Sequence, residues 1–404
     1  MKKRVVITGI GVVSPIGTGK ETFWKALIRG KNGVEKAKKL DTSKYRTHMA
    51  AEVKDFDPKK FIEPKRVKSY SLLTQYAIAV VKMALDDSKL NISSGNRVGI
   101  AMGANTADPL VFAEALIFWS KHKRSLTPSH IYEKLNTNLP VVKTAQYFGL
   151  KGPCTVIPAA CAAGNTNIAY AFDLIKTGKA DAMFAGGYAC MNHLAYSGFN
   201  KMRAMSPQYC QPFDKNRKGM IIGEGAGVIL IEDMECALRR KAKIYAEILG
   251  YGLGCDAYNP AMPDPEGSGG MIATKMALKM AKVSPHDIDY INAHGTGTIS
   301  NDRMEARIIN NIFKSKDNGV KVSSIKSMVG HCMGAASGIE ACASALIVER
   351  DIIPPNINYS EPDPYCDIDI VANTALKKRV NIMLSNAFAF GGDAGVIVVG
   401  KFKR

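Results

Sequence analysis

The stretch V-I-P-A-A-C-A-A-G-N-T-N-I-A-Y-A-F-D-L-I (156–175) places a thiol, Cys161, among the smallest side chains of the chain. Only Pro, Ala and Gly surround it from position 158 to position 164, and a helix-like apolar pattern follows. Protein interiors are closely packed, so side chains this small predict that a second backbone segment, or a substrate, lies against Cys161. A β-rich run that turns into a helix is typical of an α/β fold.

The same plan recurs later in the chain. The stretch V-S-S-I-K-S-M-V-G-H-C-M-G-A (322–335) is a second β-rich run that leads into a helix start of Gly and Ala. Helix-like segments at 80–90 and 273–283 both contain Lys-Met-Ala-Leu, and a strand-like run follows each of them. We therefore predict two similar βα halves, 1–248 and 249–404, which pack closely because small residues begin both helices.

Composition narrows the classes of function. The 404 residues are 46% hydrophobic, and no apolar run reaches the roughly 18 residues that a membrane span needs. The nine cysteines are an odd number without a C-x-x-C pair, which favours free thiols in a reducing cytoplasm over disulfides or zinc. The chain begins with charged residues directly before a strand-like run, which differs from a secretory signal. We expect a cytoplasmic protein without a membrane partner.

The net charge of +18 is unusual. Two basic clusters stand out: Lys59, Lys60, Lys65, Arg66 and Lys68, and then Lys121, Lys123 and Arg124. Aromatic residues do not alternate with the cations in either cluster, so a base-stacking platform is unsupported and we expect no nucleic-acid partner. A solvated basic surface and a docking site for an acidic macromolecule are the interpretations left open.

Candidate chemistry reduces to one thiol and two histidines. The start of the chain (8–21) is rich in glycine, but position 14 is Ser. A dinucleotide-binding or phosphate-binding loop would need glycine there. No set of four metal ligands and no G-x-S-x-G elbow occurs. Cys161, His294 and His331 each stand at a predicted strand end among small residues, where α/β folds place their sites. The start of a helix at Cys161 would favour the thiolate.

Seven motifs together resemble one family. They are R-V-V-I-T-G-I-G-V-V-S-P-I-G, A-C-A-A-G-N, P-F-D-K-N-R-K-G-M-I-I-G-E-G-A-G-V, N-A-H-G-T-G-T-I-S-N-D-R-M-E, S-S-I-K-S-M-V-G-H-C-M-G-A-A, P-P-N-I-N and F-A-F-G-G-D. With them the chain resembles, from end to end, the β-ketoacyl-[acyl-carrier-protein] synthases, which are elongating condensing enzymes. The resemblance implies the thiolase-like fold, a five-layered αβαβα sandwich of two similar halves.

The resemblance also implies roles for particular residues. Cys161 matches the nucleophile that carries the acyl chain as a thioester. His294 and His331 match the histidines that stabilise the enolate formed when a malonyl unit loses carbon dioxide. Lys326 and Glu305 would hold these groups in position.

Further residues match the substrate path. The N–H groups of Cys161 and Phe390 would form an oxyanion hole, and the Phe390 ring would act as a gate. Thr296 and Thr298 match hydroxyls that bond the pantetheine arm. Substrates would arrive on the phosphopantetheine of an acyl carrier protein, so we expect no permanently bound cofactor and no metal. The cations expected to dock this acidic carrier are Lys65, Arg66 and Lys68, with Arg203, Lys123 and Arg124 as weaker candidates.

Some segments depart from the fatty-acid pattern. The usual Phe-Gly-Phe-Gly-Gly-Thr-Asn is F-A-F-G-G-D-A here, and Ala389 in place of glycine would stiffen the gate, beside Asp393. The runs N-D-R-M-E, S-S-I-K-S-M and P-D-P-Y-C-D are closer to the ketosynthase subunits of type II polyketide systems. We expect that branch, with fatty-acid elongation as the alternative, and a homodimer or a heterodimer with a subunit like a chain-length factor. A non-catalytic partner subunit is the other class, but it should lack Cys161. The second histidine argues against a thiolase.

Overall fold

The computed structural model describes residues 3–92, 97–104, 116–121 and 136–403. The described strands before residue 245 are β1 (Val5–Ser14), β2 (Gly17–Thr18), β3 (Glu35–Lys36), β4 (Met49–Ala50), β5 (Val98–Gly103), β6 (Cys154–Thr155), β7 (Ala182–Ala189) and β8 (Gly225–Asp233). Those that follow are β9 (Ala246–Cys255), β10 (Tyr290–Asn292), β11 (Lys321–Ser323), β12 (Ile352–Ile353), β13 (Leu376–Lys377), β14 (Ile382–Phe388) and β15 (Asp393–Gly400).

Helices separate most of these strands. The described helices are α1 (Lys20–Ile28), α2 (Pro64–Val67), α3 (Leu72–Ser88), α6 (Leu139–Phe148), α7 (Ala163–Lys176), α8 (His193–Lys201), α9 (Met234–Arg239), α10 (Ser268–Ala281), α11 (Ile299–Phe313), α12 (Ser315–Asn318), α13 (Lys326–Val329) and α14 (Ala336–Arg350). Short 3-10 turns occur at η1 (Pro58–Lys60), η2 (Ala160–Ala162), η3 (Pro285–Asp287), η4 (Met333–Ala335) and η5 (Pro364–Cys366).

The two halves have the same strand topology. The main sheet runs β11-β10-β14-β15-β9-β1-β8-β7-β5-β6. Each half contributes five of these strands. If the five are numbered in chain order, their order in the sheet, read from the outer edge, is 3-2-4-5-1 in both halves. In both halves the first three of these strands pair in parallel and the last two pairings are antiparallel. The two similar halves predicted from the sequence echoes are therefore confirmed.

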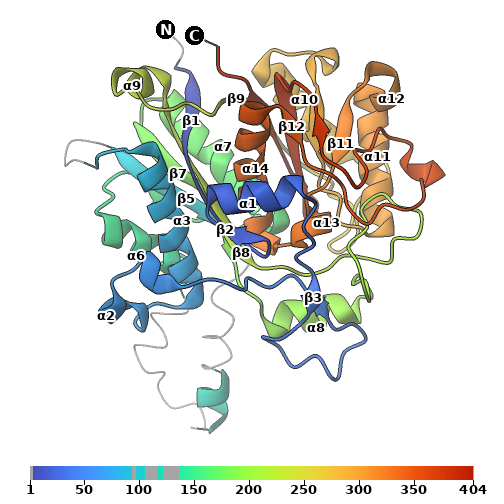
Figure 1. Cartoon of the computed structure of the whole chain (residues 1–404), viewed down its shortest axis with the longest axis horizontal. Coiled ribbons are helices and arrows are strands. Elements are labelled where there is room, and N and C mark those ends of the chain that lie inside the picture. Colours follow the sequence, from blue (N-terminus) through green and yellow to red (C-terminus); the bar gives the residue numbers. More distant parts are fainter. Residues whose placement is uncertain (1–2, 93–96, 105–115, 122–135, 404) are drawn as a thin grey trace.

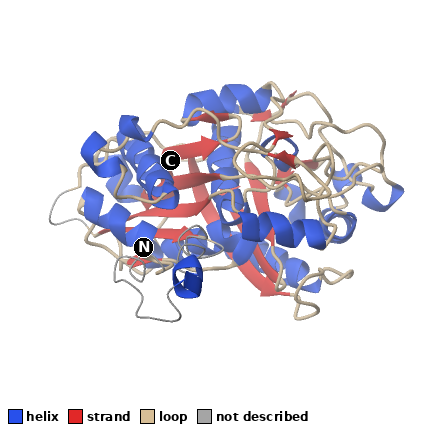
Figure 2. Ribbon diagram, turned by 90° about the horizontal axis from the view of Figure 1, so that it is seen from below, coloured by secondary structure: helices blue, strands red, loops and turns tan. Residues whose placement is uncertain are grey.

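The halves join where β1 pairs with the start of β9, between Val5–Ile7 and Ala246–Ile248. Strand β9 spans the predicted division between 248 and 249, which stays a prediction. The helices α7 and α14 contact each other and strands of both halves, whereas α3 and α10 each pack against strands of one half. Figure 1 shows α14 between the blue and green first half and the orange and red second half. In Figure 2 helices lie outside the strands and between them, as a five-layered αβαβα sandwich requires.

Local sequence explains these layers. Helix α14, A-S-G-I-E-A-C-A-S-A-L-I-V-E-R, consists mostly of small and apolar residues, and it is buried from Ala336 to Val348, as expected of a helix between two sheets. Strands β7 and β8 are buried along almost their whole length, which fits strands covered on both faces. Among the described residues, no helix has the length and apolar character needed to cross a membrane.

Candidate active site

Cys161 lies in the turn η2, two residues before α7, and its side chain is buried. Ala160, directly before it, has φ = 43°, a left-handed conformation that is uncommon outside glycine. The turn η4, which leads into α14, has the same feature, since Met333 has φ = 49°. Strained backbone of this kind persists only where the surrounding structure holds it, and it concentrates at functional sites.

Burial raises the pKa of the Cys161 thiol to about 12. The positive charge of Lys326 and hydrogen bonds from the backbone N–H groups of Cys161 and Phe390 lower this pKa, but they do not offset burial. The expectation that the helix start would favour a thiolate is therefore wrong for the free protein, because desolvation is the larger effect. The same two N–H groups were predicted to form the oxyanion hole, and they point at the sulfur.

His294 follows β10 and His331 follows α13, and both line the pocket that contains Cys161. Their ring centroids are 5.3 Å apart, with the ring planes at 84°. The backbone N–H of Met333 donates to Nδ1 of His331 at 3.1 Å, so a neutral His331 carries its proton on Nε2. Burial, and then the charge of Lys326, hold the pKa of both imidazoles well below its usual range. Both rings are therefore neutral N–H donors at pH 7.

Lys326 begins α13, and its Nζ lies 2.5 Å from Oε1 of Glu340 on α14. Both side chains are completely buried. Lys326 therefore acts on the pocket through its charge, which lowers the pKa of the two histidines and of Cys161.

Glu305, on α11, holds the backbone on which His294 stands. One carboxylate oxygen accepts from the N–H of His294 at 2.8 Å and the other from that of Gly295 at 2.7 Å. The amide of Asn386, on β14, also donates to this carboxylate, at 3.1 Å. Burial raises the pKa of Glu305 to about 7.

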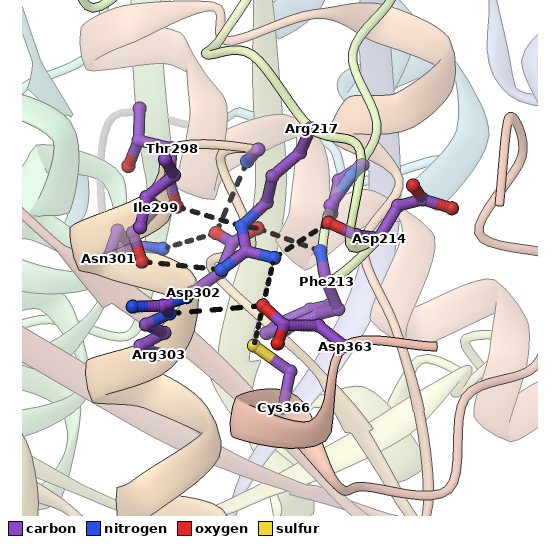
Figure 3. Close-up of polar contacts among 12 residues, drawn as sticks. Phe213, Asp214, Arg217, Thr298, Ile299, Asn301, Asp302, Arg303, Asp363 and Cys366 are labelled. Carbon is purple, nitrogen blue, oxygen red and sulfur yellow. Dashed lines mark hydrogen bonds and ion pairs between the residues drawn. The ribbon is translucent and has the colours of Figure 1, made fainter. Parts of the chain in front are cut away.

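Thr296 and Thr298 follow His294 and line the same pocket, with their hydroxyl oxygens 2.9 Å apart. A buried arginine bonds this loop (Figure 3). Arg217 is paired with Asp302 at 3.5 Å and with Asp363 at 2.6 Å, and its Nε donates to the Thr298 carbonyl at 3.4 Å.

Asp302 completes this support. Its carboxylate accepts from the N–H of Gly297 at 3.2 Å and from that of Phe213 at 2.7 Å. Sequence reasoning missed both members of the pair, although Arg217 and Asp302 each stand in one of the seven motifs. A charged side chain close to the small and apolar residues of G-M-I-I-G was the available signal.

The described residues contain no group of three or more His, Cys, Asp and Glu side chains that could hold a metal ion. The nine cysteines all lie within the described residues, and all are free thiols. The groups gathered around the pocket are therefore a buried thiol, two neutral imidazoles, a pair of N–H groups and two hydroxyls. This set suits acyl transfer to sulfur and stabilisation of an enolate.

Comparison with known proteins agrees with this chemistry. Residues 2–237 match the beta-ketoacyl synthase N-terminal domain, and residues 245–360 match the C-terminal domain of the same family. The chain belongs to the β-ketoacyl synthase family. It is thus an acyltransferase-type condensing enzyme.

Relatives match this synthase along its whole length. It is 39% identical to the 3-oxoacyl-[acyl-carrier-protein] synthase 2 of Staphylococcus aureus (strain COL) and 38% identical to that of Coxiella burnetii, with 99% of each chain covered. Among solved structures, it is similar to the ishigamide ketosynthase/chain length factor, with a TM-score of 0.94 and 35% identity. It is also similar to a type II polyketide ketosynthase solved with its acyl-carrier protein (AntDE:AntF), with a TM-score of 0.91 and 30% identity. Both comparisons cover 100% of each chain.

Phe390, which was predicted to act as a gate, lies at the edge of the pocket. Phe390 is 40% exposed, and its ring centroid is 5.4 Å from that of Phe199 on α8. Gly391 and Gly392 have φ values of 90° and 87°, so the loop bends at glycines. Ala389 donates from its N–H to the carbonyl of Asp393 at 2.8 Å, which closes the turn.

The residues predicted to dock a carrier are exposed. Lys65 and Arg66 lie on α2, with Lys68 just after it, and both of the first two lie within 4 Å of the Glu63 carboxylate. Arg203 follows α8 and stands beside Ala204, which lines the pocket. Figure 1 shows α2 and α8 well apart, so these cations form two patches within one chain. Lys123 and Arg124 lie outside the described residues.

Proposed function

We propose that the synthase catalyses the decarboxylative condensation of malonyl-[acyl carrier protein] with an acyl chain held on Cys161. One observation carries this proposal: Cys161, His294 and His331 line a single buried pocket. In the first step the sulfur of Cys161 attacks the acyl thioester, loses its proton and releases the carrier thiol. The raised pKa of Cys161 means that this proton must leave as the new bond forms.

In the second step the malonyl group loses carbon dioxide and leaves an enolate. The N–H groups of His294 and His331 stabilise the negative oxygen. The enolate carbon then attacks the thioester, and the N–H groups of Cys161 and Phe390 stabilise the oxyanion that forms. The thiolate of Cys161 departs and takes up a proton from water, and the β-ketoacyl product leaves on the carrier.

Substrate delivery follows from the same pocket. We expect the phosphopantetheine arm to run along Thr296 and Thr298, whose hydroxyls can bond its amides. An acyl carrier protein is the partner that presents this arm. The second subunit is either a copy of this chain or a chain-length-factor-like protein. Similarity to the ishigamide ketosynthase/chain length factor supports a partner of the latter kind.

The decisive experiment follows acylation by intact mass. The wild-type protein, mixed with an acyl carrier, should gain the mass of one acyl group. Cys161→Ala should gain none, while Cys161→Gln should still decarboxylate malonyl-[acyl carrier protein]. An acyl adduct that persists on Cys161→Ala would refute the assignment of the nucleophile.

Two pathways use this condensation. Polyketide synthesis is favoured by the runs N-D-R-M-E, S-S-I-K-S-M and P-D-P-Y-C-D and by the polyketide ketosynthases among the similar structures. Fatty-acid elongation is favoured by the curated relatives at 39% identity. Rescue of a strain that lacks its own elongating synthase would support the fatty-acid pathway. Co-purification with a homologue that lacks the nucleophile, together with no rescue, would support the polyketide pathway.

A further inference from the structure

Ser324 lies between the segments that carry the two histidines. It directly follows β11, and it is fully buried. Its hydroxyl donates to the carbonyl of Gly295 at 2.8 Å, with the carbonyl of His294 3.4 Å away. The same hydroxyl accepts from the N–H of Lys326, the first residue of α13, at 3.3 Å. One oxygen atom therefore joins the turn after His294 to the helix that leads to His331.

The two segments also pack directly against each other at this point. Gly295 has φ = 37°, and a Cβ atom built on it would lie 2.6 Å from the Cβ of Ser324. There is thus no room for another side chain between them. Glu305 accepts from the N–H groups of His294 and Gly295, whereas Ser324 bonds the carbonyl side of the same stretch. The backbone that carries His294 is therefore held through both kinds of polar group.

Ser324 is itself held on both sides of its backbone. Its N–H donates to Oδ1 of Asn356 at 3.2 Å, and Nδ2 of Asn356 donates in turn to the Pro212 carbonyl at 3.0 Å. The carbonyl of Ser324 accepts from the hydroxyl of Ser327 at 2.9 Å. Asn356 and Ser327 are fully buried. The protein alone thus fixes the position of Ser324, as a preorganised site requires.

We propose that Ser324 is a positioning residue, which fixes the two histidine-bearing segments relative to each other so that both imidazole N–H groups point at the same enolate oxygen. This inference rests on the proposed function, in which His294 and His331 stabilise that oxygen together. Two donors reach one atom only if their backbones keep a fixed separation. Transfer of the acyl group to Cys161 forms no enolate, so Ser324 matters after that transfer and not before it.

The test measures the two steps separately in Ser324→Ala. Intact mass follows acylation of Cys161, and labelled carbon dioxide follows decarboxylation of malonyl-[acyl carrier protein] by the acylated enzyme. Ser324→Ala should acylate at the wild-type rate. It should release carbon dioxide about ten- to a hundredfold more slowly, because a misplacement of about 1 Å costs rate on this order.

Ser315→Ala is the matched control. Ser315 is also fully buried, and its hydroxyl donates to the Val320 carbonyl at 2.6 Å and accepts from the N–H of Asp369 at 3.2 Å. None of these three residues lines the pocket of Cys161. Both variants lose one donated and one accepted hydrogen bond, so both should melt earlier than the wild type. Ser315→Ala should nevertheless keep the rates of both steps.

Ser324→Cys provides a second variant, because a thiol is a weaker donor at the same place. Its rate of carbon dioxide release should lie between those of the wild type and Ser324→Ala. The inference is overturned if Ser324→Ala releases carbon dioxide at the wild-type rate, if it slows both steps equally, or if Ser315→Ala slows the release as strongly. It also fails if neither Ser324 variant folds, since Ser324 would then serve the fold. A wild-type protein that neither acylates Cys161 nor releases carbon dioxide would instead remove the proposed function.

Discussion

Gly164 of α7 lies against Gly338 of α14 so closely that a Cβ atom at position 164 would be 2.4 Å from the backbone nitrogen of Gly338. Ser337 adds hydrogen bonds at this contact, since its hydroxyl donates to the Cys161 carbonyl at 3.3 Å and accepts from the N–H of Asn165 at 3.1 Å. The small residues around Cys161 thus admit a second backbone, as the sequence predicted. The contact also fixes the turn of the nucleophile against the half that carries the histidines.

Gly164→Ala should therefore destabilise the protein, by about 1–3 kcal/mol or more, because a methyl group has no room against the backbone of α14. Gly198→Ala is the matched control: Gly198 lies in α8 with nothing within 4 Å of the added atom. That change should stabilise the protein by about 1 kcal/mol through helix propensity. Thermal unfolding of the two variants checks both signs, and equal melting temperatures would contradict the close contact.

His294→Ala and His331→Ala should still accept an acyl group on Cys161 but should fail to elongate it. The enolate appears only after this transfer, so loss of an N–H donor affects the second step, on the order of a hundredfold or more for each variant. Intact mass measures the first step, and release of labelled carbon dioxide measures the second. If either variant condenses at a near-normal rate, the histidine that it lacks does not belong to the site.

Arg217→Lys should weaken use of the pantetheine arm. Lysine keeps the charge but loses the planar set of donors that bonds Asp363 and the Thr298 carbonyl, so the Thr296–Thr298 loop should lose its fixed position. The KM for an acyl-pantetheine should rise about tenfold, the equivalent of one lost charge-assisted hydrogen bond. Alkylation of Cys161 by iodoacetamide, which needs no pantetheine site, should keep its rate. Equal loss in both assays would indicate general unfolding instead.

The charge of Lys326 should set the acid limit of condensation. Lys326→Met combined with Glu340→Gln removes the buried pair as a unit and avoids leaving one unpaired charge, which alone would cost about 3–5 kcal/mol. Without the positive charge, the pKa of His294 and His331 should rise. The imidazoles would then become protonated at a higher pH, so the acid limb of the activity profile should move upward in pH. A pH–rate profile with an unmoved acid limb would exclude this role.

Charge reversal at Lys65 and Arg66 should raise the apparent KM for acyl-[acyl carrier protein]. Carrier proteins are acidic, so attraction between the two surfaces speeds their encounter, and the effect should weaken as salt shortens a Debye length of about 8 Å. Turnover of a small pantetheine thioester should not change. Lys275→Glu, at an exposed position on α10, provides a control with the same kind of charge change. An equal rise in KM with both substrates would mean that the α2 cations serve the fold or an interface.

The sequence predicts the fold and the residues that meet at the pocket because both leave local signals. The repeated β-rich runs around 155–164 and 322–335 correspond to equivalent turns in the two halves. Cys161 and the histidines stand out because small residues surround them. The position of Arg217 gave a signal, but its pairing with Asp302 and Asp363 could not be predicted, since these partners come from distant segments. The protonation state of Cys161 also escaped prediction, because burial depends on packing and not on neighbouring residues alone.

Ala160 and Met333 both have a left-handed backbone conformation, so the turns η2 and η4 can be aligned residue by residue. This alignment determines how many acyl groups one chain can carry. Each residue opens a short turn before a central helix, so the counterpart of Cys161 in the second half is Gly334. A position without a side chain has no nucleophile. The internal symmetry of the fold therefore does not extend to the proposed chemistry: with Cys161 as the proposed nucleophile, each polypeptide has one loading point, and a two-subunit assembly carries two acyl groups only if both of its members retain the thiol.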